Sequence, residues 1–144
     1  MLEFCKKQYD KYKEIINYLI FGILTTAVNF IVYILMTKLF NVNEVLSNAI
    51  AWIISVIFAY ITNKIYVFES KTRALKEIIK EFISFVTCRL FSGILDIGSF
   101  YWFVTILGWN DIISKVIISV LVVILNYVFS KIFIFKKKNN EIEN

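Results

Sequence analysis

The 144-residue sequence contains no histidine and no proline, and only four glycines and two cysteines. The absence of histidine excludes a histidine-based metal site or catalytic triad. Cys5 lies in a basic leader and Cys88 in an apolar run, which is not the spacing of a zinc site or a redox pair. With these kinds of site excluded, the residues that are abundant in the chain are the informative ones.

Apolar residues make up 59% of the chain and aromatic residues 17%, and the mean hydropathy is +0.72. Soluble domains are nearer to about 45–50% apolar. Four apolar runs cover residues 15–40, 45–68, 82–109 and 112–135. Each is longer than the roughly 20 residues that a helix needs to cross the hydrocarbon of a bilayer. Because backbone groups in lipid must be bonded within the segment, we predict four transmembrane helices.

The two halves of the chain match each other at one constant offset without a gap. KEII at 13–16 matches KEFI at 80–83, NEVLS at 43–47 matches NDIIS at 110–114, and KIYVF at 64–68 matches KIFIF at 131–135. Internal repeats define architecture more strongly than other sequence signals. We therefore predict an all-α membrane fold made of two tandem two-helix repeats, about 13–68 and about 80–135, related by a pseudo-two-fold axis along the membrane normal.

The basic residues indicate the orientation of this fold. Four lie in the leader (1–14), four in the middle link (69–81) and three in the tail (136–144), whereas the short links at 41–44 and 108–111 contain none. The positive-inside rule therefore places both termini and the middle link in the cytoplasm. Part of the middle link, 73–81, is either an interfacial helix or a solvated loop. The first apolar run is too long for a signal-peptide core, so we expect no cleavable signal.

Charged side chains interrupt the apolar runs, although a charge in hydrocarbon costs about 2.5–3.5 kcal/mol on insertion scales. Arg89 and Asp96 both lie in the third run, and about two helical turns separate them, which places them on one face. Asp96 matches Asn29 in the repeat, and we expect these two to line a polar seam near the midplane. We predict that Arg89 converges with Lys64 and Lys131 on one anion, for which a phosphate is the natural candidate.

Each of these residues also has a structural interpretation. Lys64 and Lys131 are placed as anchors whose side chains extend to the headgroups. Arg89 and Asp96 are spaced to neutralise each other as an ion pair. Lys115, near the outer end of the fourth run, is either another anchor or a partner of Asp96. Amide side chains at three positions suit hydrogen bonds between helices: Asn29, Asn48 and Asn126.

The order of motifs points to a family. The first run opens with NYLIFG at 17–22 and continues to Asn29, and the second closes with NKIYVF at 63–68. The third opens with Phe85 and Arg89, and the fourth closes with NY at 126–127 and SKIFIF at 130–135. From about residue 15 to 135 this order resembles the GtrA-like family of small four-helix membrane proteins. Lys64 and Lys131 stand where that family often has arginine.

The resemblance implies binding and translocation of a polyprenyl-phosphate-linked sugar, commonly undecaprenyl-phosphate glucose, across the cytoplasmic membrane for cell-surface polysaccharide synthesis. It also implies a membrane glycosyltransferase as partner, and a homodimer is a further expectation. We assign the lipid phosphate to Arg89, Lys64, Lys131, Asn63 and Asn126, and the midplane seam to Asn29 and Asp96. We expect no enzyme activity, no cofactor, no metal and no nucleic-acid partner.

Two other functions fit the same sequence. One is a non-transporting scaffold that docks the glycosyltransferase in the membrane. The other is a small cation or drug exporter, which also commonly has four helices. Such exporters usually depend on an acidic residue in the first helix, where this chain has only Asn29, although Asp96 keeps that alternative open.

Overall fold

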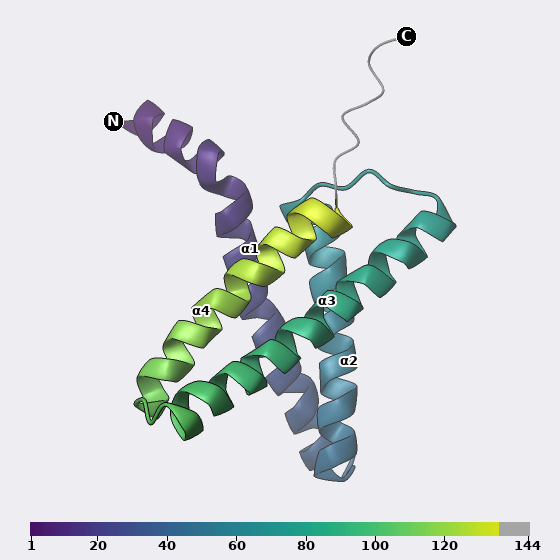
Figure 1. Ribbon diagram of the computed structural model, residues 1–144. Helices are drawn as coiled ribbons and strands as arrows, with labels where there is room; N and C mark the ends of the chain where they lie inside the picture. The colour runs from purple at the N-terminus through teal and green to yellow at the C-terminus, as the bar shows by residue number, and fades with distance from the viewer. Residues whose placement is uncertain (136–144) are drawn as a thin grey trace. The chain divides into compact units, whose positions relative to one another are not determined.

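The computed structural model describes residues 1–135, which form helices joined by short links and contain no strand. The chain divides into two compact units, Met1–Ser70 and Lys71–Asn144. Each unit is a pair of long helices packed side by side (Figure 1), and we call these units the first and the second hairpin. The predicted all-helical class is confirmed for this part of the chain, and the predicted tail, 136–144, lies outside it.

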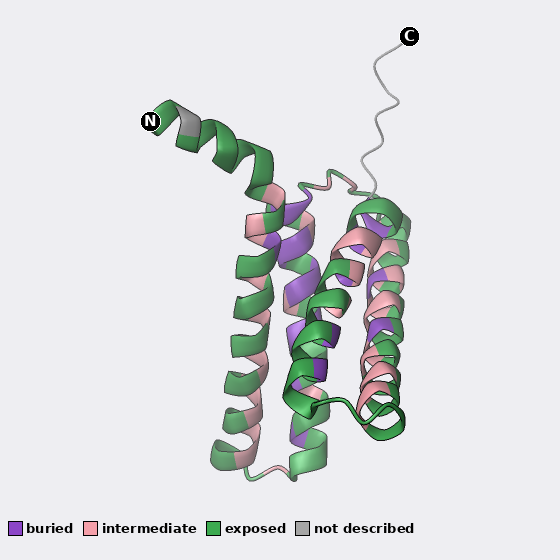
Figure 2. Ribbon diagram, turned by 60° about the vertical axis from the view of Figure 1, so that its left-hand side comes forward, coloured by how far each residue is buried: buried purple, intermediate pink, exposed green. Residues whose placement is uncertain are grey.

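The first hairpin consists of α1 (Leu2–Ile34) and α2 (Glu44–Thr62), and each helix ends in a π-helical turn, η1 (Leu35–Leu39) and η2 (Asn63–Val67). The leader is itself helical, because α1 begins at Leu2 and continues without a break into the apolar stretch. Figure 2 shows these first turns extending away from α2.

The second hairpin consists of α3 (Leu75–Tyr101) and α4 (Asp111–Phe129), which end in the π-helical turns η3 (Trp102–Ile106) and η4 (Ser130–Ile134). The middle link is shorter than predicted, because α3 already begins at Leu75. Most of the stretch for which we left a loop or an interfacial helix open therefore forms the first turns of α3.

Three helical segments in the described range are long and apolar enough to cross a membrane: Cys5–Leu39, Glu44–Val67 and Asp111–Ile134. The helix outside this group is α3, whose apolar stretch contains Arg89 and Asp96. Many large apolar side chains are exposed on both hairpins, and exposed residues follow much of α1 in Figure 2. Apolar surface of this extent marks contact with lipid or with another protein. The chain is a helical membrane protein.

Both hairpin links are closed by asparagine caps. The side chain of Asn43 accepts a hydrogen bond from the Leu46 amide at 2.8 Å, and that of Asn110 accepts one from the Ile113 amide at 3.1 Å. Such caps satisfy amide groups that have no partner at a helix start. Before the caps, Asn41 and Gly108 adopt positive φ angles of 52° and 66°. Left-handed residues of this kind end helices sharply, which gives the short links.

Positions that match in the sequence comparison of the two halves adopt matching local structure. The offset that aligns the sequence motifs also aligns both ends of α2 with those of α4, and η2 with η4. At these ends, Tyr18 contacts Phe68 with ring centroids 6.4 Å apart, and Phe85 contacts Phe135 at 6.2 Å, both with interplanar angles of 56°. All four rings are buried. In each hairpin, an aromatic contact therefore fixes the helix end that carries Lys64 or Lys131.

Candidate functional site

Lys64 lies in η2, at the end of α2, and its side chain is half-buried. Its Nζ donates a hydrogen bond to Ser70 Oγ at 3.1 Å. A cation near a helix C-terminus also compensates the partial negative charge of the last carbonyl groups. The hydrogen bond holds this ammonium group close to the chain that leaves the first hairpin.

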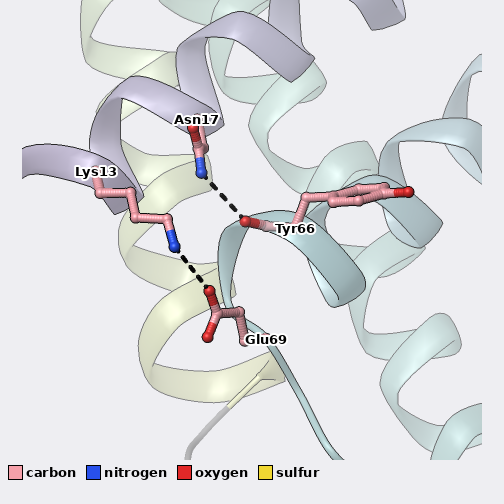
Figure 3. A network of polar contacts seen from close by, with 4 residues as sticks. All are labelled: Lys13, Asn17, Tyr66 and Glu69. Atoms are coloured by element: carbon pink, nitrogen blue, oxygen red, sulfur yellow. Dashed lines mark hydrogen bonds and ion pairs between the residues drawn. The ribbon is translucent and has the colours of Figure 1, made fainter. Parts of the chain in front are cut away.

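A polar network shown in Figure 3 ties this end of the hairpin to α1. The amide of Asn17 donates to the carbonyl of Tyr66 at 3.3 Å, and Lys13 Nζ lies 3.2 Å from Glu69 Oε1. Glu69 adopts a positive φ of 47°, which is uncommon for glutamate. The network fixes the backbone on both sides of the turn that follows Lys64.

Asn63 and Asn126, both predicted to bind phosphate, are buried, with exposed fractions of 3% and 8%. Asn63 Oδ1 accepts no hydrogen bond from any residue in 1–135. A buried polar atom without a partner costs about 1–3 kcal/mol, so this amide is held in place at a cost to folding. Both amides therefore lie below the accessible surface of their hairpins.

Arg89 lies in α3 and is half-buried. Its guanidinium group stacks over the Phe85 ring, with Cζ 5.1 Å from the ring centroid. Phe85 is 1% exposed and is itself packed against Phe135. Within the described residues Arg89 forms no ion pair. The proposed neutralisation of Arg89 by Asp96 is therefore absent, and the guanidinium fork rests on a rigid aromatic platform without a carboxylate.

Lys131 lies in η4 of the same hairpin as Arg89 and is exposed. Its Nζ lies 3.4 Å from the Tyr127 hydroxyl and 5.6 Å from the centroid of that ring. The helix α3 contacts η4, so two of the three predicted phosphate-binding cations come from adjoining elements of one hairpin. Lys64, the third, belongs to the first hairpin.

Asp96 forms an ion pair with Lys115. Of the two roles that the sequence allowed for Lys115, an anchor or a partner of Asp96, the structure therefore shows the second. Lys115 Nζ lies 3.1 Å from Asp96 Oδ2 and 3.5 Å from Oδ1, and the side chains are 55% and 27% exposed. Lys115 also lies 5.6 Å from the Phe100 ring centroid. The carboxylate of the predicted polar seam is thus neutralised across α3 and α4 by a lysine of its own hairpin.

In the first hairpin the equivalent positions hold two amides, Asn29 and Asn48. Asn29 Nδ2 donates to Ser55 Oγ at 3.3 Å, which joins α1 to α2. Asn29 and Asn48 also line an open groove of about 470 Å³. The groove is completed by one carboxylate, two rings and one aliphatic side chain: Glu44, Phe30, Tyr33 and Val45. It lies at the end of the hairpin where α2 begins.

Comparison with known proteins identifies the family. The GtrA/DPMS transmembrane domain model matches residues 17–135. The chain belongs to the GtrA/DPMS family. The resemblance predicted from the motifs is thereby confirmed. All seven predicted site residues and the whole groove lie within the matched range, whereas the whole leader, Lys13 included, precedes it.

The GtrA/DPMS assignment is supported by relatives of similar length. The membrane protein YwcD of Bacillus subtilis is 38% identical over 124 residues, which cover 86% of this chain and 98% of YwcD. The cell wall teichoic acid glycosylation protein GtcA of Listeria monocytogenes serovar 1/2a is 41% identical, covering 90% of this chain and 89% of GtcA. GtcA of Listeria innocua serovar 6a is 42% identical, covering 88% of each. No solved structure matches.

The groove of this GtrA/DPMS chain was not predicted from the sequence, where Asn29 was assigned to a polar seam and both Asn29 and Asn48 to hydrogen bonds between helices. The repeat offset contained the missing signal, because it aligns Asn29 with Asp96 and Asn48 with Lys115. A pair of positions that is charged in one hairpin and carries two amides in the other marks a place where the two hairpins differ chemically.

Proposed function

We propose that this GtrA/DPMS protein binds a polyprenyl-phosphate-linked sugar and carries it across the cytoplasmic membrane for cell-surface glycosylation. The observation that carries the proposal is Arg89, a half-buried cation in an apolar helix that stacks on Phe85 and has no ion pair in residues 1–135. Ionisable groups inside membranes usually serve a function. The GtcA relatives, named for teichoic acid glycosylation, support a role in cell-wall glycosylation.

The proposed architecture has four membrane spans, with α3 as the fourth. The hairpins are tandem repeats related by a pseudo-two-fold axis along the membrane normal, and both termini and the middle link lie in the cytoplasm. The equal offset between the ends of α2 and α4 supports the repeat, and the distribution of basic residues supports the orientation. A helix with two intramembrane charges suits a position that faces a polar path or a partner.

In the proposed mechanism the phosphate first meets cations at the cytoplasmic ends of the helices. Arg89 offers a bidentate fork, and Lys131 and Lys64 add point charges. Asn63 and Asn126, whose side chains are buried, complete the proposed phosphate site. The sugar phosphate then passes along the seam of Asn29 and Asp96, while the prenyl chain stays in lipid. Because Asp96 is paired with Lys115, the seam presents a neutral pair instead of a bare negative charge.

The proposal assigns no catalytic step to this chain. The sequence has no glycine-rich phosphate loop, so transport would run on a gradient or on consumption of the product outside. A membrane glycosyltransferase would supply the lipid-linked sugar, and a second copy of this chain or that partner would complete the path.

A binding measurement tests the phosphate site. In nanodiscs, Arg89→Ala should bind undecaprenyl phosphate roughly 10- to 100-fold more weakly than the wild type, since charge-assisted hydrogen bonds contribute about 1.5–3 kcal/mol. Lys38→Gln, which removes an exposed lysine at the opposite end of the first hairpin, is the matched control and should bind normally. Equal affinity of Arg89→Ala and the wild type would remove the phosphate site from the proposal.

A transport measurement separates the carrier from the scaffold. Purified protein in liposomes should move undecaprenyl-phosphate glucose between leaflets, and Arg89→Ala should slow that movement by at least the loss in affinity. If the wild type binds the lipid and co-purifies with a glycosyltransferase but moves no lipid, the scaffold function replaces the carrier.

A further inference from the structure

The groove of the first hairpin has the chemistry of a site for hydroxyl groups. The Asn48 amide offers two donors and an acceptor, and the Asn29 amide offers an acceptor and the N–H that does not face Ser55. The Glu44 carboxylate offers acceptors, and Tyr33 adds a hydroxyl. The rings of Phe30 and Tyr33 supply flat apolar surface beside these polar groups. The lining therefore combines a few polar groups with apolar surface, as the lining of small-molecule sites does.

We infer that this groove holds the sugar ring of the lipid-linked substrate after the headgroup has crossed the membrane. The inference rests on the proposed function and adds a second binding site to it. The ligand is a neutral pyranose, recognised through its hydroxyl groups by the amides and the carboxylate, and covered by the aromatic rings.

Charge excludes the phosphate itself from this place. Neither lysine nor arginine lines the groove, and Glu44 would repel an anion. In the second hairpin the equivalent positions, Asp96 and Lys115, bind each other and so occupy their own polar groups. Of the two hairpins, the first therefore offers amides to a ligand at this level, and the second offers an ion pair.

The position of the groove along α2 separates it from the predicted phosphate site. Glu44 is the first residue of α2, and Lys64 lies beyond the last residue of that helix, in η2. The helical rise places the two about 30 Å apart along the helix axis. One sugar phosphate cannot contact both ends at once. The groove extends from Glu44, at the end of the hairpin that the positive-inside rule places outside, toward Asn29, which bonds Ser55 within α2. A ring held between Glu44 and Asn48 therefore belongs to a headgroup that has left Lys64.

The test uses the second hairpin as a template for the first. Asn29→Asp/Asn48→Lys installs there the residues of the Asp96–Lys115 pair, which the second hairpin holds at the matching positions. Binding in nanodiscs is measured for undecaprenyl phosphate and for undecaprenyl-phosphate glucose. The wild type should prefer the glycosylated lipid about tenfold, the equivalent of one or two net hydrogen bonds. The double variant should lose this preference and keep its affinity for undecaprenyl phosphate within about twofold.

Two further variants provide a substitution in the groove without added charge and a control outside it. Asn48→Leu removes one amide without adding charge and should lower the preference about two- to tenfold. Lys38→Gln lies outside the groove and should retain the full preference. A wild type without preference, or a preference that both groove variants retain, would overturn the inference while leaving the phosphate site intact. If undecaprenyl phosphate itself fails to bind, the proposed function fails first, so the two failures are distinguishable.

A competition experiment with a free sugar tests whether the bound ring is lipid-linked or free. Methyl glucoside at the concentrations used for the lipid should neither bind nor displace undecaprenyl-phosphate glucose, because the prenyl anchor concentrates the headgroup at the membrane. Displacement by methyl glucoside at those concentrations would reassign the groove to free sugar and overturn the lipid-linked assignment.

Discussion

Two serines show how the same residue at equivalent positions has different energetic consequences. Ser47 and Ser114 are separated by the offset at which motifs of the two halves match, and they are 0% and 1% exposed. Ser47 Oγ donates to the Val42 carbonyl at 3.2 Å, which binds the start of α2 to the preceding link. Ser114 Oγ has no hydrogen-bond partner within residues 1–135. A buried hydroxyl with a partner stabilises, and one without a partner destabilises.

Alanine substitutions should therefore separate these serines. Ser47→Ala should lower the free energy of unfolding by about 1 kcal/mol, because a buried hydrogen bond is lost. Ser114→Ala should leave the stability unchanged or raise it, because an unsatisfied hydroxyl is removed. Thermal unfolding of the purified protein in detergent measures both, with each variant serving as the other's control. A larger loss for Ser114→Ala would contradict the assignment of its hydroxyl.

Replacement of Arg89 by lysine tests geometry at constant charge. Lysine cannot form the planar fork, although it keeps the positive charge near Phe85. Arg89→Lys should bind undecaprenyl phosphate with an affinity between those of the wild type and Arg89→Ala in the nanodisc assay. An affinity equal to that of the wild type would show that charge alone suffices at this position.

At the scale of the helix, the starts of α2 and α4 depend on single side chains. Asn43 and Asn110 accept hydrogen bonds from the first turns of these helices, directly after the left-handed residues Asn41 and Gly108. Helix packing in a membrane lacks a hydrophobic drive between helices, so local terms such as caps matter more there.

Removing either cap should cost a similar amount. Asn43→Ala and Asn110→Ala should each lower the free energy of unfolding by about 1 kcal/mol, as loss of a helix N-cap generally does. Replacement by serine or aspartate should restore most of the loss, because both residues cap helices well. The measurement is again thermal unfolding in detergent, and a serine variant as unstable as the alanine variant would argue against capping as the cause.

The elements differ in how far the sequence could predict them. Apolar run length and the NEVLS and NDIIS motifs were enough to place the hairpin links, because caps and turns are local chemistry. The continuation of α1 through the leader was not predicted, since a polar helical stretch carries no apolar periodicity of its own. The partner of Asp96 was left open, because Lys115 lies on another helix and only packing decides between it and Arg89.

The residues of the candidate site could be predicted from the sequence. Which of them are buried, and which together line a groove, could not. Arg89, Lys64 and Lys131 stand out because charges in apolar runs are rare. That Asn63 and Asn126 are buried depends on helix rotation, which the nearly uniform apolar runs do not encode. The groove depends on the spatial approach of Asn29 to Asn48 across two helices, and only the charged pair at the equivalent positions hinted at it.

At the scale of the whole molecule, orientation in the membrane decides which end of each hairpin meets the substrate first. Cys5 is exposed in the first turns of α1 and offers a natural probe. In a Cys88→Ala background, a membrane-impermeant maleimide should label Cys5 only after the cells are permeabilised. In a Cys5→Ala/Cys88→Ala background, Val42→Cys should be labelled in intact cells. The opposite pattern would invert the orientation and with it the roles of the two ends.

The unbroken α1 has a mechanical consequence. Its 33 residues extend about 50 Å, whereas about 20 residues suffice to cross the hydrocarbon. The surplus turns form an arm that continues the helix bearing Asn29 and bends away from α2 in Figure 2. Because α1 is one continuous helix from this arm to Asn29, a partner that binds the arm would act on the same helix that lines the groove.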